Sequence, residues 1–451
     1  MRILLVTHYF PPNHIGGTET LTLALAKSLQ DRGHEVQVIC AEDFDRAPSH
    51  KITATDDVHR GIPVRRLHFN WALAPDVFGS LYNNPEVEAY FHTYLAHYQP
   101  DIVHITSCYT LSASVINAVK QTGIPMILTA TDFWFLCSRN TLLQSDGALC
   151  TGPENAWKCA KCKLADAKVY RWPNAILPET IVAKLLLSIG KIPAITRQRG
   201  LRGMHGDWDH RHEFLMAALD KVNQIVTASH LVESYFIQYG VPAEKIVFSR
   251  YGFDTSWAER HQEKTPSEAL RLGFIGNILS IKGPDLLLKA VKALDSKLPL
   301  KVKIYGNLEK VPEYGQRLRD IAGNDERISF EGTFPYHDIG KVLENIDVLV
   351  VPSIWYDFPL IIPSALATKT PVIATDMPGM NELIRHEVDG LLFARHDVQG
   401  LTHQINRLFA EPELLQTLRA GIQPVKTVET MTEEYLARYH ALLGVASPVA
   451  A

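Results

Sequence analysis

The sequence alternates short apolar runs with amphipathic stretches, and the alternation recurs in both halves of the chain. Residues 2–7 form an apolar run that predicts a strand. Residues 18–32 carry apolar side chains at the spacing of one helix face, and a second strand is predicted at 34–40. The same rhythm returns from residue 270. Strand–helix–strand repetition predicts doubly wound parallel sheets, so the expected fold class is α/β.

The chain has 451 residues, too many for one ordinary domain. Hydrophobic residues make up 46% and charged residues 21%, which excludes a mainly disordered chain. The formal charge of -4 gives no support to nucleic-acid binding. We expect an N-terminal domain (1–258) with an insert (132–211), a linker (259–268), a C-terminal domain (269–428) and a terminal helix (429–446) that crosses back to the first domain.

The apolar run at the N-terminus is too short for a secretory signal, and no stretch approaches the length of a membrane-spanning helix. We therefore expect a cytoplasmic protein. The segment 184–211 is rich in Lys and Arg beside apolar residues, which is also typical of peripheral contact with an anionic membrane. A solvated insert that packs on the first domain is the alternative.

Glycine-containing loops follow the first predicted strand of each half. Gly16 and Gly17 precede the first helix, and Gly276 begins a loop that ends at Lys282 and Gly283. Ligands of open α/β sheets bind where such loops meet helix N-termini, and a lysine there can neutralise a diphosphate leaving group. A tight turn and a solvated surface lysine are the simpler interpretations.

Two carboxylates occur near predicted helix starts in the second half. Asp357 follows an apolar strand and a Pro/aromatic loop, and it could cap the next helix or bind a sugar hydroxyl. Glu382 comes after the Gly379 turn and opens another helix, where a carboxylate is stabilised without any ligand. Both residues are candidates for binding and for purely structural roles.

The cysteines fall into two groups. Cys40 and Cys108 lie in apolar surroundings and are expected to be inert core residues. The other four are close together in the insert and include a Cys-x2-Cys pair, a pattern typical of a closed structural site for zinc or an iron–sulfur cluster. Four unrelated thiols are the alternative. The predicted metal ligands are Cys137, Cys150, Cys159 and Cys162.

Motifs over nearly the whole chain resemble those of the family-4 retaining glycosyltransferases. The cysteine insert is similar to that of a subset of the family. The motifs are Phe10-Pro11-Pro12, Gly16-Gly17-Thr18-Glu19, Arg32-Gly33-His34-Glu35-Val36, Asp101-Ile102-Val103-His104, Ala228-Ser229, Tyr251-Gly252, Gly276 with Lys282-Gly283, the block 355–367, Pro371-Val372-Ile373-Ala374, Gly379 with Glu382, and Asp389-Gly390-Leu391-Leu392-Phe393.

The resemblance implies a GT-B fold, in which two Rossmann-like domains with parallel sheets face each other across a cleft. It places a nucleotide-diphosphate sugar, UDP- or GDP-linked, mainly on the C-terminal domain and the acceptor on the N-terminal one. No catalytic divalent metal is expected, and the anomeric configuration would be retained.

The resemblance also implies residue roles. Lys282 would contact the donor diphosphate, Glu382 would lie near the donor sugar, and Gly16 and Gly17 would face the phosphates. Three positions depart from the family pattern: Asn277 stands where Arg is common, Ser364 replaces a ribose-binding Glu, and Thr131 replaces a His before Asp132. The predicted catalytic set is Lys282, Asp132, Thr131 and Glu382, and the predicted donor-binding set is Gly16, Gly17, Gly276, Asn277, Lys282, Asp357, Ser364, Gly379 and Glu382.

The expected function is therefore transfer of a hexose-type sugar to a glycan, lipid-linked or small-molecule acceptor in the biosynthesis of a polysaccharide or glycoconjugate. A lipid-linked acceptor would place the protein peripherally at the inner face of a membrane. The three departures support an alternative: a catalytically degenerate protein that serves as a binding or scaffold subunit. An epimerase or a phosphorylase would need acid/base groups or a cofactor lysine that cannot be assigned in this sequence.

Overall fold

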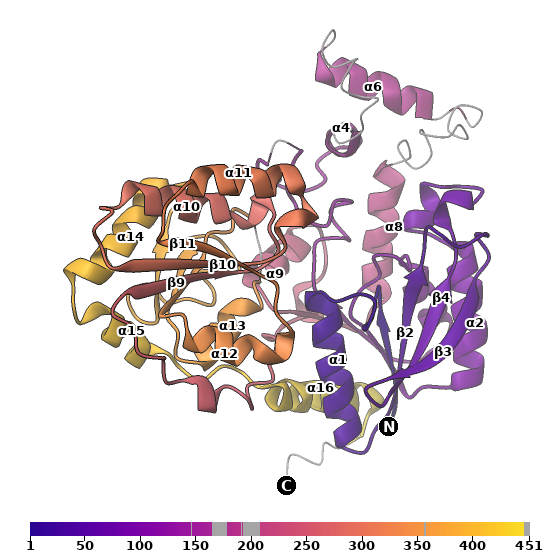
Figure 1. Ribbon diagram of the computed structural model, residues 1–451. Coiled ribbons are helices and arrows are strands. Elements are labelled where there is room, and N and C mark those ends of the chain that lie inside the picture. Colours follow the sequence, from indigo (N-terminus) through magenta and orange to yellow (C-terminus); the bar gives the residue numbers. More distant parts are fainter. Residues whose placement is uncertain (146, 165–177, 191, 193–207, 356–357, 446–451) are drawn as a thin grey trace. The chain divides into compact units, whose positions relative to one another are not determined.

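The computed structural model describes residues 1–145, 147–164, 178–190, 192, 208–355 and 358–445 (Figure 1). The chain divides into two compact units. Unit 1 comprises Met1–Ala228, Val232–Gly252 and Val428–Ala451, and unit 2 comprises Ser229–Leu231 and Phe253–Thr427. The expected linker, 259–268, lies inside unit 2, where Glu259–His261 form a short 3-10 helix.

Unit 1 is built on an eight-stranded sheet with the order β3-β4-β2-β1-β5-β6-β7-β8. The central strands form because their runs of Val, Ile and Leu are buried on both faces, as β1 is from its second residue onward. The strands are β1 (Arg2–Thr7), β2 (Glu35–Asp43), β3 (Thr53–His59), β4 (Ile62–His68), β5 (Ile102–Ile105), β6 (Met126–Ala130), β7 (Gln224–Thr227) and β8 (Ile246–Phe248).

The pairing of β3 corrects the expectation of a wholly parallel sheet, because β3 runs antiparallel to β4. A two-residue turn joins them, and both of its residues, Arg60 and Gly61, have positive φ angles of 49° and 83°. Such turns match the twist of a hairpin. β3 is exposed along almost its whole length, as an edge strand can be.

The helices of unit 1 connect and cover these strands. A helix start is well defined at α2, where the Asn84 side chain accepts hydrogen bonds from the backbone of Glu86 and Val87. The helices are α1 (Gly17–Asp31), α2 (Pro85–Tyr98), α3 (Ser114–Thr122), α4 (Ala156–Leu164), α6 (Glu179–Gly190), α8 (Trp208–Lys221), α9 (His230–Gln238, whose first two residues belong to unit 2) and α16 (Val428–Leu443).

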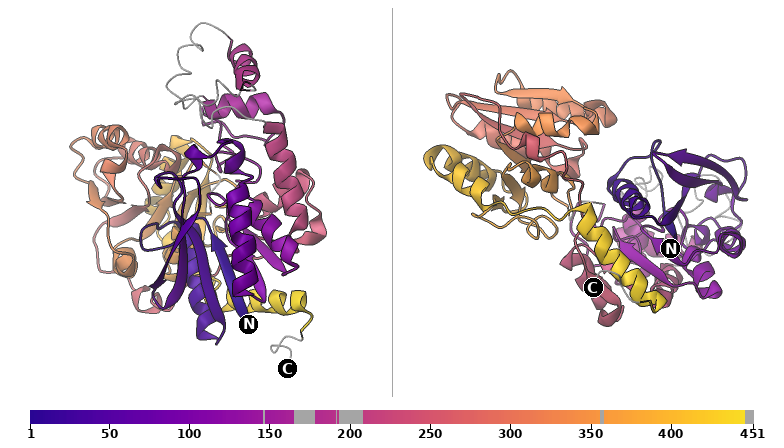
Figure 2. Two further views of the ribbon diagram at one scale, coloured as in Figure 1. Left: turned by 90° about the vertical axis from the view of Figure 1, so that its right-hand side faces the viewer. Right: turned by 90° about the horizontal axis from the view of Figure 1, so that it is seen from below.

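The last helix, α16, belongs to unit 1 and packs against α1 (Figure 2). It is fixed by a buried polar network. His104 Nδ1 lies 2.6 Å from the Tyr439 hydroxyl, and its Nε2 lies 2.7 Å from Thr129 Oγ1. Thr129 Oγ1 in turn lies 2.7 Å from the Tyr435 hydroxyl. Burial lowers the pKa of His104 to about 3, so the ring is neutral in this network.

The insert lies between β6 and β7, and its described part includes α4 and α6. Arg211, at the end of the predicted basic segment, is not a surface residue. Its side chain is buried, donates a hydrogen bond to the Trp134 carbonyl at 2.6 Å and lies over the Trp134 ring. Arg211 therefore belongs to the core of unit 1, where its guanidinium packs on the aromatic face of Trp134. Lys191, Arg197, Arg199 and Arg202 lie outside the described residues.

Unit 2 contains a six-stranded sheet with the order β11-β10-β9-β12-β13-β14, and all of its pairings are parallel. The α/β class and the two parallel-sheet domains are thus confirmed, apart from the edge strand β3. The strands are β9 (Leu270–Ile275), β10 (Leu300–Tyr305), β11 (Ile328–Gly332), β12 (Val348–Val351), β13 (Val372–Thr375) and β14 (Gly390–Phe393).

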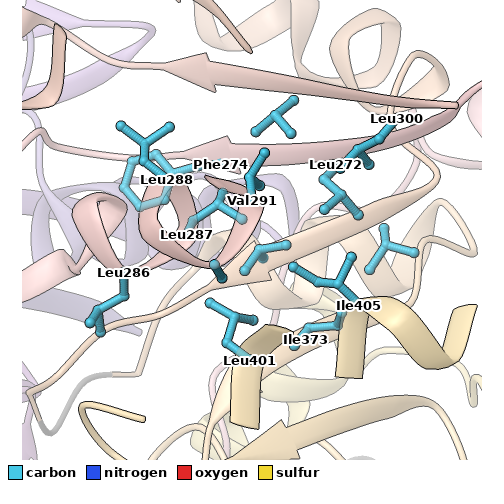
Figure 3. Packing of buried hydrophobic residues seen from close by; sticks show 14 of the residues in the cluster. Leu272, Phe274, Leu286, Leu287, Leu288, Val291, Leu300, Ile373, Leu401 and Ile405 are labelled. Atoms are coloured by element: carbon cyan, nitrogen blue, oxygen red, sulfur yellow. The ribbon is translucent and has the colours of Figure 1, made fainter. Parts of the chain in front are cut away.

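Helices lie on both faces of this sheet, with α10 and α11 on one side and α12 and α13 on the other (Figure 1). The core between sheet and helices combines Leu272 and Phe274 of β9 with Leu287 and Val291 of α10 (Figure 3). The helices of unit 2 are α10 (Pro284–Ala293), α11 (Pro312–Ala322), α12 (Ile339–Glu344), α13 (Ile361–Ala367), α14 (Val398–Ala410) and α15 (Leu414–Gly421).

Candidate functional site

The strand order of unit 2 locates a binding position before any side chain is considered. From β9 the chain builds outward through β10 and β11, then returns to add β12 on the other side of β9. The order therefore reverses between β9 and β12. In open parallel sheets, ligands bind at the carboxyl ends of the two strands that flank such a reversal. Here those ends are followed by the segments 276–283 and 352–355.

These two loops are joined by hydrogen bonds. The Ile281 carbonyl accepts from the Ile354 backbone at 2.9 Å and from Ser353 Oγ at 3.0 Å. Gly283 follows with a φ of 68°, and a Cβ at this position would lie 2.0 Å from the Pro352 carbonyl oxygen. Only glycine fits there, which explains the Lys-Gly pair of the sequence.

Lys282 lies at the end of a 3-10 helix (Ser280–Lys282) directly before α10. Its Nζ is 5.2 Å from the centroid of the Trp355 ring, so the residue spans from the loop after β9 to the loop after β12. Burial lowers the pKa of Lys282 to about 8. A partly desolvated ammonium beside a helix N-terminus is a strong partner for a diphosphate.

A second cation lies beside Asn277, where the family commonly has Arg. Lys310 follows β10 in a short 3-10 helix (Leu308–Lys310), and its Nζ donates a hydrogen bond to Asn277 Oδ1 at 3.0 Å. Sequence reasoning missed Lys310 because it is far from Asn277 along the chain. The available signal was its position just after a strand that neighbours β9.

Glu382 has defined partners. Its carboxylate accepts from Ser229 Oγ at 3.1 Å and from the backbone N–H groups of His230 and Leu231 at 2.8 Å and 3.3 Å. These three residues belong to unit 2 and open α9. The carboxylate thus stabilises a helix N-terminus in this structure. Gly379, with a φ of 90°, provides the turn before it.

The other predicted donor-binding residues of unit 2 differ in their placement. Gly276 donates its backbone N–H to the Tyr305 carbonyl at 3.1 Å, which ties the loop to β10. Ser364 lies in α13, is buried, and its Oγ points to the Leu360 carbonyl at 3.4 Å. Asp357 lies outside the described residues.

Unit 1 has its own order reversal, between β1 and β5. Gly16 caps α1, and its carbonyl accepts from the Thr20 backbone at 3.1 Å. Glu19, in the first turn of α1, has a nearly buried carboxylate whose Oε1 lies 3.3 Å from His8 Nε2. Burial alone would raise the pKa of Glu19, but the hydrogen bond and charge of His8 outweigh it and lower that pKa.

Asp132 and Thr131 follow β6 on the same edge of the sheet. Asp132 Oδ1 accepts from the Trp134 backbone at 2.8 Å, and Thr131 Oγ1 donates to the Thr106 carbonyl at 3.0 Å. Burial raises the pKa of Asp132, while the Trp134 N–H and His8 partly counter it. His8 therefore interacts with both Asp132 and Glu19. His8 directly follows β1, but no motif in the sequence distinguishes it as a site residue.

The four cysteines of the insert line a single pocket. Within the described residues, however, no group of three or more His, Cys, Asp or Glu side chains is arranged to hold a metal ion. The predicted zinc or iron–sulfur site is therefore not supported. The prediction rested on four cysteines close together in the sequence, including the Cys-x2-Cys pair. In the structure Cys159 and Cys162 lie one turn apart in α4, and burial raises the pKa of both thiols.

No helix among the described residues is long and apolar enough to cross a membrane.

Two family models match the chain, one in each unit. Residues 16–172 match the glycosyl transferase 4-like domain, and residues 255–423 match the glycosyl transferases group 1. The chain thus contains one glycosyltransferase domain in each half, as its motifs predicted.

Curated relatives match part of the chain. The D-inositol 3-phosphate glycosyltransferase 1 of Catenulispora acidiphila is 26% identical over 223 residues, which are 46% of this chain and 53% of that protein. The D-inositol 3-phosphate glycosyltransferase of Mycobacterium marinum is 29% identical over 201 residues, 41% of this chain and 42% of that protein. The matched part of the chain thus spans about half the length of these relatives or less.

Solved structures share the fold over nearly the whole chain. A glycosyltransferase from Rickettsia africae has a TM-score of 0.65 at 16% identity and covers 99% of this chain and 100% of its own. Anabaena HepE, solved with UDP, has a TM-score of 0.62 at 16% identity and covers 96% of this chain and 95% of its own. These similarities establish the GT-B fold class.

Proposed function

We propose that the protein is a retaining glycosyltransferase that takes its sugar from a UDP-sugar. The single observation that carries this proposal is Lys282 at the order reversal of unit 2, half-buried, beside Trp355 and directly before a helix N-terminus. Similar proteins support it: the two relatives named above are D-inositol 3-phosphate glycosyltransferases, and HepE was solved with UDP and with UDP-glucose.

In the proposed reaction, the bond between the sugar C1 and the diphosphate oxygen breaks while an acceptor hydroxyl oxygen bonds to C1 from the same face. The hydroxyl proton leaves with the departing diphosphate. Negative charge grows on that diphosphate, and the Lys282 ammonium and the N-terminus of α10 are placed to stabilise it. Lys310, next to Asn277, supplies a second positive charge at the end of β10.

For the acceptor we propose a hydroxyl of a glycan, a lipid-linked sugar or a small molecule in a polysaccharide or glycoconjugate pathway. Unit 1 would contribute His8, Glu19 and Asp132 at the carboxyl ends of β1 and β6. The paired imidazole and carboxylates provide donors and acceptors suited to sugar hydroxyls.

The proposal is tested by a thermal-shift screen with UDP, GDP and UDP-sugars, followed by measurement of sugar transfer or donor hydrolysis. UDP should raise the melting temperature because a ligand of the native state stabilises it. Lys282→Ala should lower kcat by about 100-fold. The matched control is Lys297→Ala, an exposed lysine in the turn before β10, at the amino ends of the strands.

The second candidate function is that of a protein with the same fold that binds the nucleotide but does not catalyse sugar transfer. The engaged carboxylate of Glu382 and the buried Ser364 favour a binding or scaffold subunit of the same pathway. In that case UDP would bind and Lys282→Ala would weaken binding, but no UDP-sugar would be turned over. If no nucleotide binds, both functions are excluded.

A further inference from the structure

The chain segments around the order reversal of the unit 1 sheet carry negative rather than positive charge. The segments that follow β1, β5 and β6, residues 8–19, 106–113 and 131–136, contain no Lys or Arg. They contain two carboxylates, those of Glu19 and Asp132. Proteins bind phosphate groups mainly with Arg, Lys and helix N-termini, and these segments lack the first two of those partners.

The helix N-terminus at this edge, that of α1, already faces a carboxylate of its own chain. Glu19 lies in the first turn of α1 and is 6% exposed. Its side chain folds back so far that a Cβ on Gly16 would lie 2.6 Å from Glu19 Oε2. A helix N-terminus attracts anions, and here the Glu19 carboxylate takes that position. A phosphate brought to the start of α1 would therefore meet negative charge.

The two histidines of segment 8–19 each face a carboxylate, so neither adds net positive charge when it is protonated. His8 Nε2 lies 3.3 Å from Glu19 Oε1, and His14 Nε2 lies 3.8 Å from Glu42 Oε1. In a neutral His8 ring with its proton on Nε2, the buried Nδ1 is an acceptor, and it has no hydrogen-bond partner among the described residues. A sugar hydroxyl can donate to this nitrogen, whereas a phosphate dianion has no proton to donate.

Arg66 of β4 reaches the same segment, but its guanidinium is not available to a ligand. The residue is 4% exposed and is ion-paired with Glu42 at 2.9 Å and with Asp57 at 2.6 Å. Its remaining N–H groups donate to the carbonyls of Phe10 and Pro11 at 3.2 Å and 2.7 Å. Arg66 therefore neutralises carboxylates of its own chain and fixes the segment after β1.

Aromatic rings at this edge provide the apolar part of a sugar site. The rings of Tyr9 and His14 are stacked, with centroids 4.0 Å apart and an interplanar angle of 13°. Tyr109, which is 37% exposed, packs edge-on against the His8 ring at 5.9 Å. The face of an aromatic ring is electron-rich, so it attracts the C–H groups of a sugar ring and repels an anion.

We propose that the acceptor ring bound by unit 1 is an uncharged sugar rather than a phosphorylated compound, and that Glu19 determines this selectivity. The inference rests on the proposed transferase function, because it specifies the acceptor of that same site. Hydroxyl groups can donate to the carboxylates and imidazoles of this edge. An anionic group is repelled there, because charges in a partly desolvated site are weakly screened.

The test compares sugars that differ by a single phosphate: myo-inositol with D-inositol 3-phosphate, and glucose with glucose 6-phosphate. Affinity for the full chain is measured by saturation-transfer difference NMR, and transfer from a UDP-sugar is measured as kcat/KM. We expect the unphosphorylated member to be preferred by about tenfold or more. Glu19→Gln, which keeps the shape but removes the charge, should reduce this preference by about tenfold. Asp132→Asn should reduce it by a smaller factor, because burial raises the pKa of Asp132 and so decreases its charge.

The matched control is Asp31→Asn, which removes an exposed carboxylate at the other end of α1 and should leave the preference unchanged. Thermal melts show that each variant is folded, and Asp132→Asn tests the proposal if Glu19→Gln does not fold. Equal affinity for both members, no affinity for either, or a preference that both site variants leave unchanged overturns the proposal. Affinity is also measured without donor. A chain that binds no UDP but prefers the unphosphorylated sugars contradicts the proposed function and not the selectivity of unit 1.

Discussion

At the scale of single residues, Lys282 has the most direct consequence for chemistry. Burial lowers its pKa to about 8, whereas a solvent-exposed lysine titrates far above neutrality. The ammonium form, which stabilises a departing diphosphate, is therefore lost at a pH only slightly above neutral. Because the Trp355 ring lies next to Lys282 Nζ, the ammonium has a defined position but is poorly hydrated.

We predict that kcat/KM falls as pH rises through about 8, since this parameter reports the pKa values of the free enzyme. Lys282→Arg keeps a positive charge at every accessible pH, so its activity, although lower, should not show this fall. Lys310→Met should raise the KM for the donor but leave the position of the fall unchanged, because Lys310 is exposed. A wild-type profile that stays flat through this range contradicts the role of Lys282.

Lys282 and Lys310 show which site residues the sequence can predict and which it cannot. Lys282 and its glycine could be predicted, because the strand, the loop and the helix start are contiguous in the chain. Lys310 could not, because its closeness to Asn277 depends on the pairing of β9 with β10. The sequence has Asn277 where Arg is common in the family, and the structure brings a lysine to Asn277 from the neighbouring loop.

At the scale of elements, α16 is held by hydroxyl groups as well as by apolar contacts. Its amphipathic pattern predicts a helix, but the pattern does not reveal the buried partners of Tyr435 and Tyr439. Those partners, His104 and Thr129, come from β5 and β6. For the cysteines the sequence pattern indicated more than the structure shows. Their spacing predicted a metal site that the geometry of the described residues does not support.

We predict that Tyr439→Phe lowers the free energy of unfolding of unit 1 by about 1–3 kcal/mol, because it leaves the buried His104 Nδ1 without its partner. Urea unfolding followed by circular dichroism measures the loss. The control is Tyr98→Phe in the same unit, since the buried Tyr98 hydroxyl forms no hydrogen bond within the described residues. That change should be neutral or stabilising. An equal loss of unfolding free energy in Tyr439→Phe and Tyr98→Phe would mean that the hydrogen bond between Tyr439 and His104 does not stabilise unit 1.

At the scale of the whole molecule, each unit has its own sheet and its own core, and α16 adds the end of the chain to unit 1. The alternating pattern predicted both sheets, because doubly wound strands are buried on both faces and have a characteristic rhythm. It did not predict the antiparallel β3, whose exposed residues carry no apolar signal. Two cores imply two unfolding events.

We predict that differential scanning calorimetry resolves two transitions and that UDP raises mainly the one belonging to unit 2. Lys282 and Lys310 both lie in unit 2, and a ligand at about 100 times its dissociation constant stabilises the native state by about 2.7 kcal/mol. Tyr439→Phe assigns the transitions, because it should lower only that of unit 1. If UDP raises the unit 1 transition equally, the Gly16–Gly17 loop holds part of the nucleotide, and the donor site cannot be assigned to unit 2 alone.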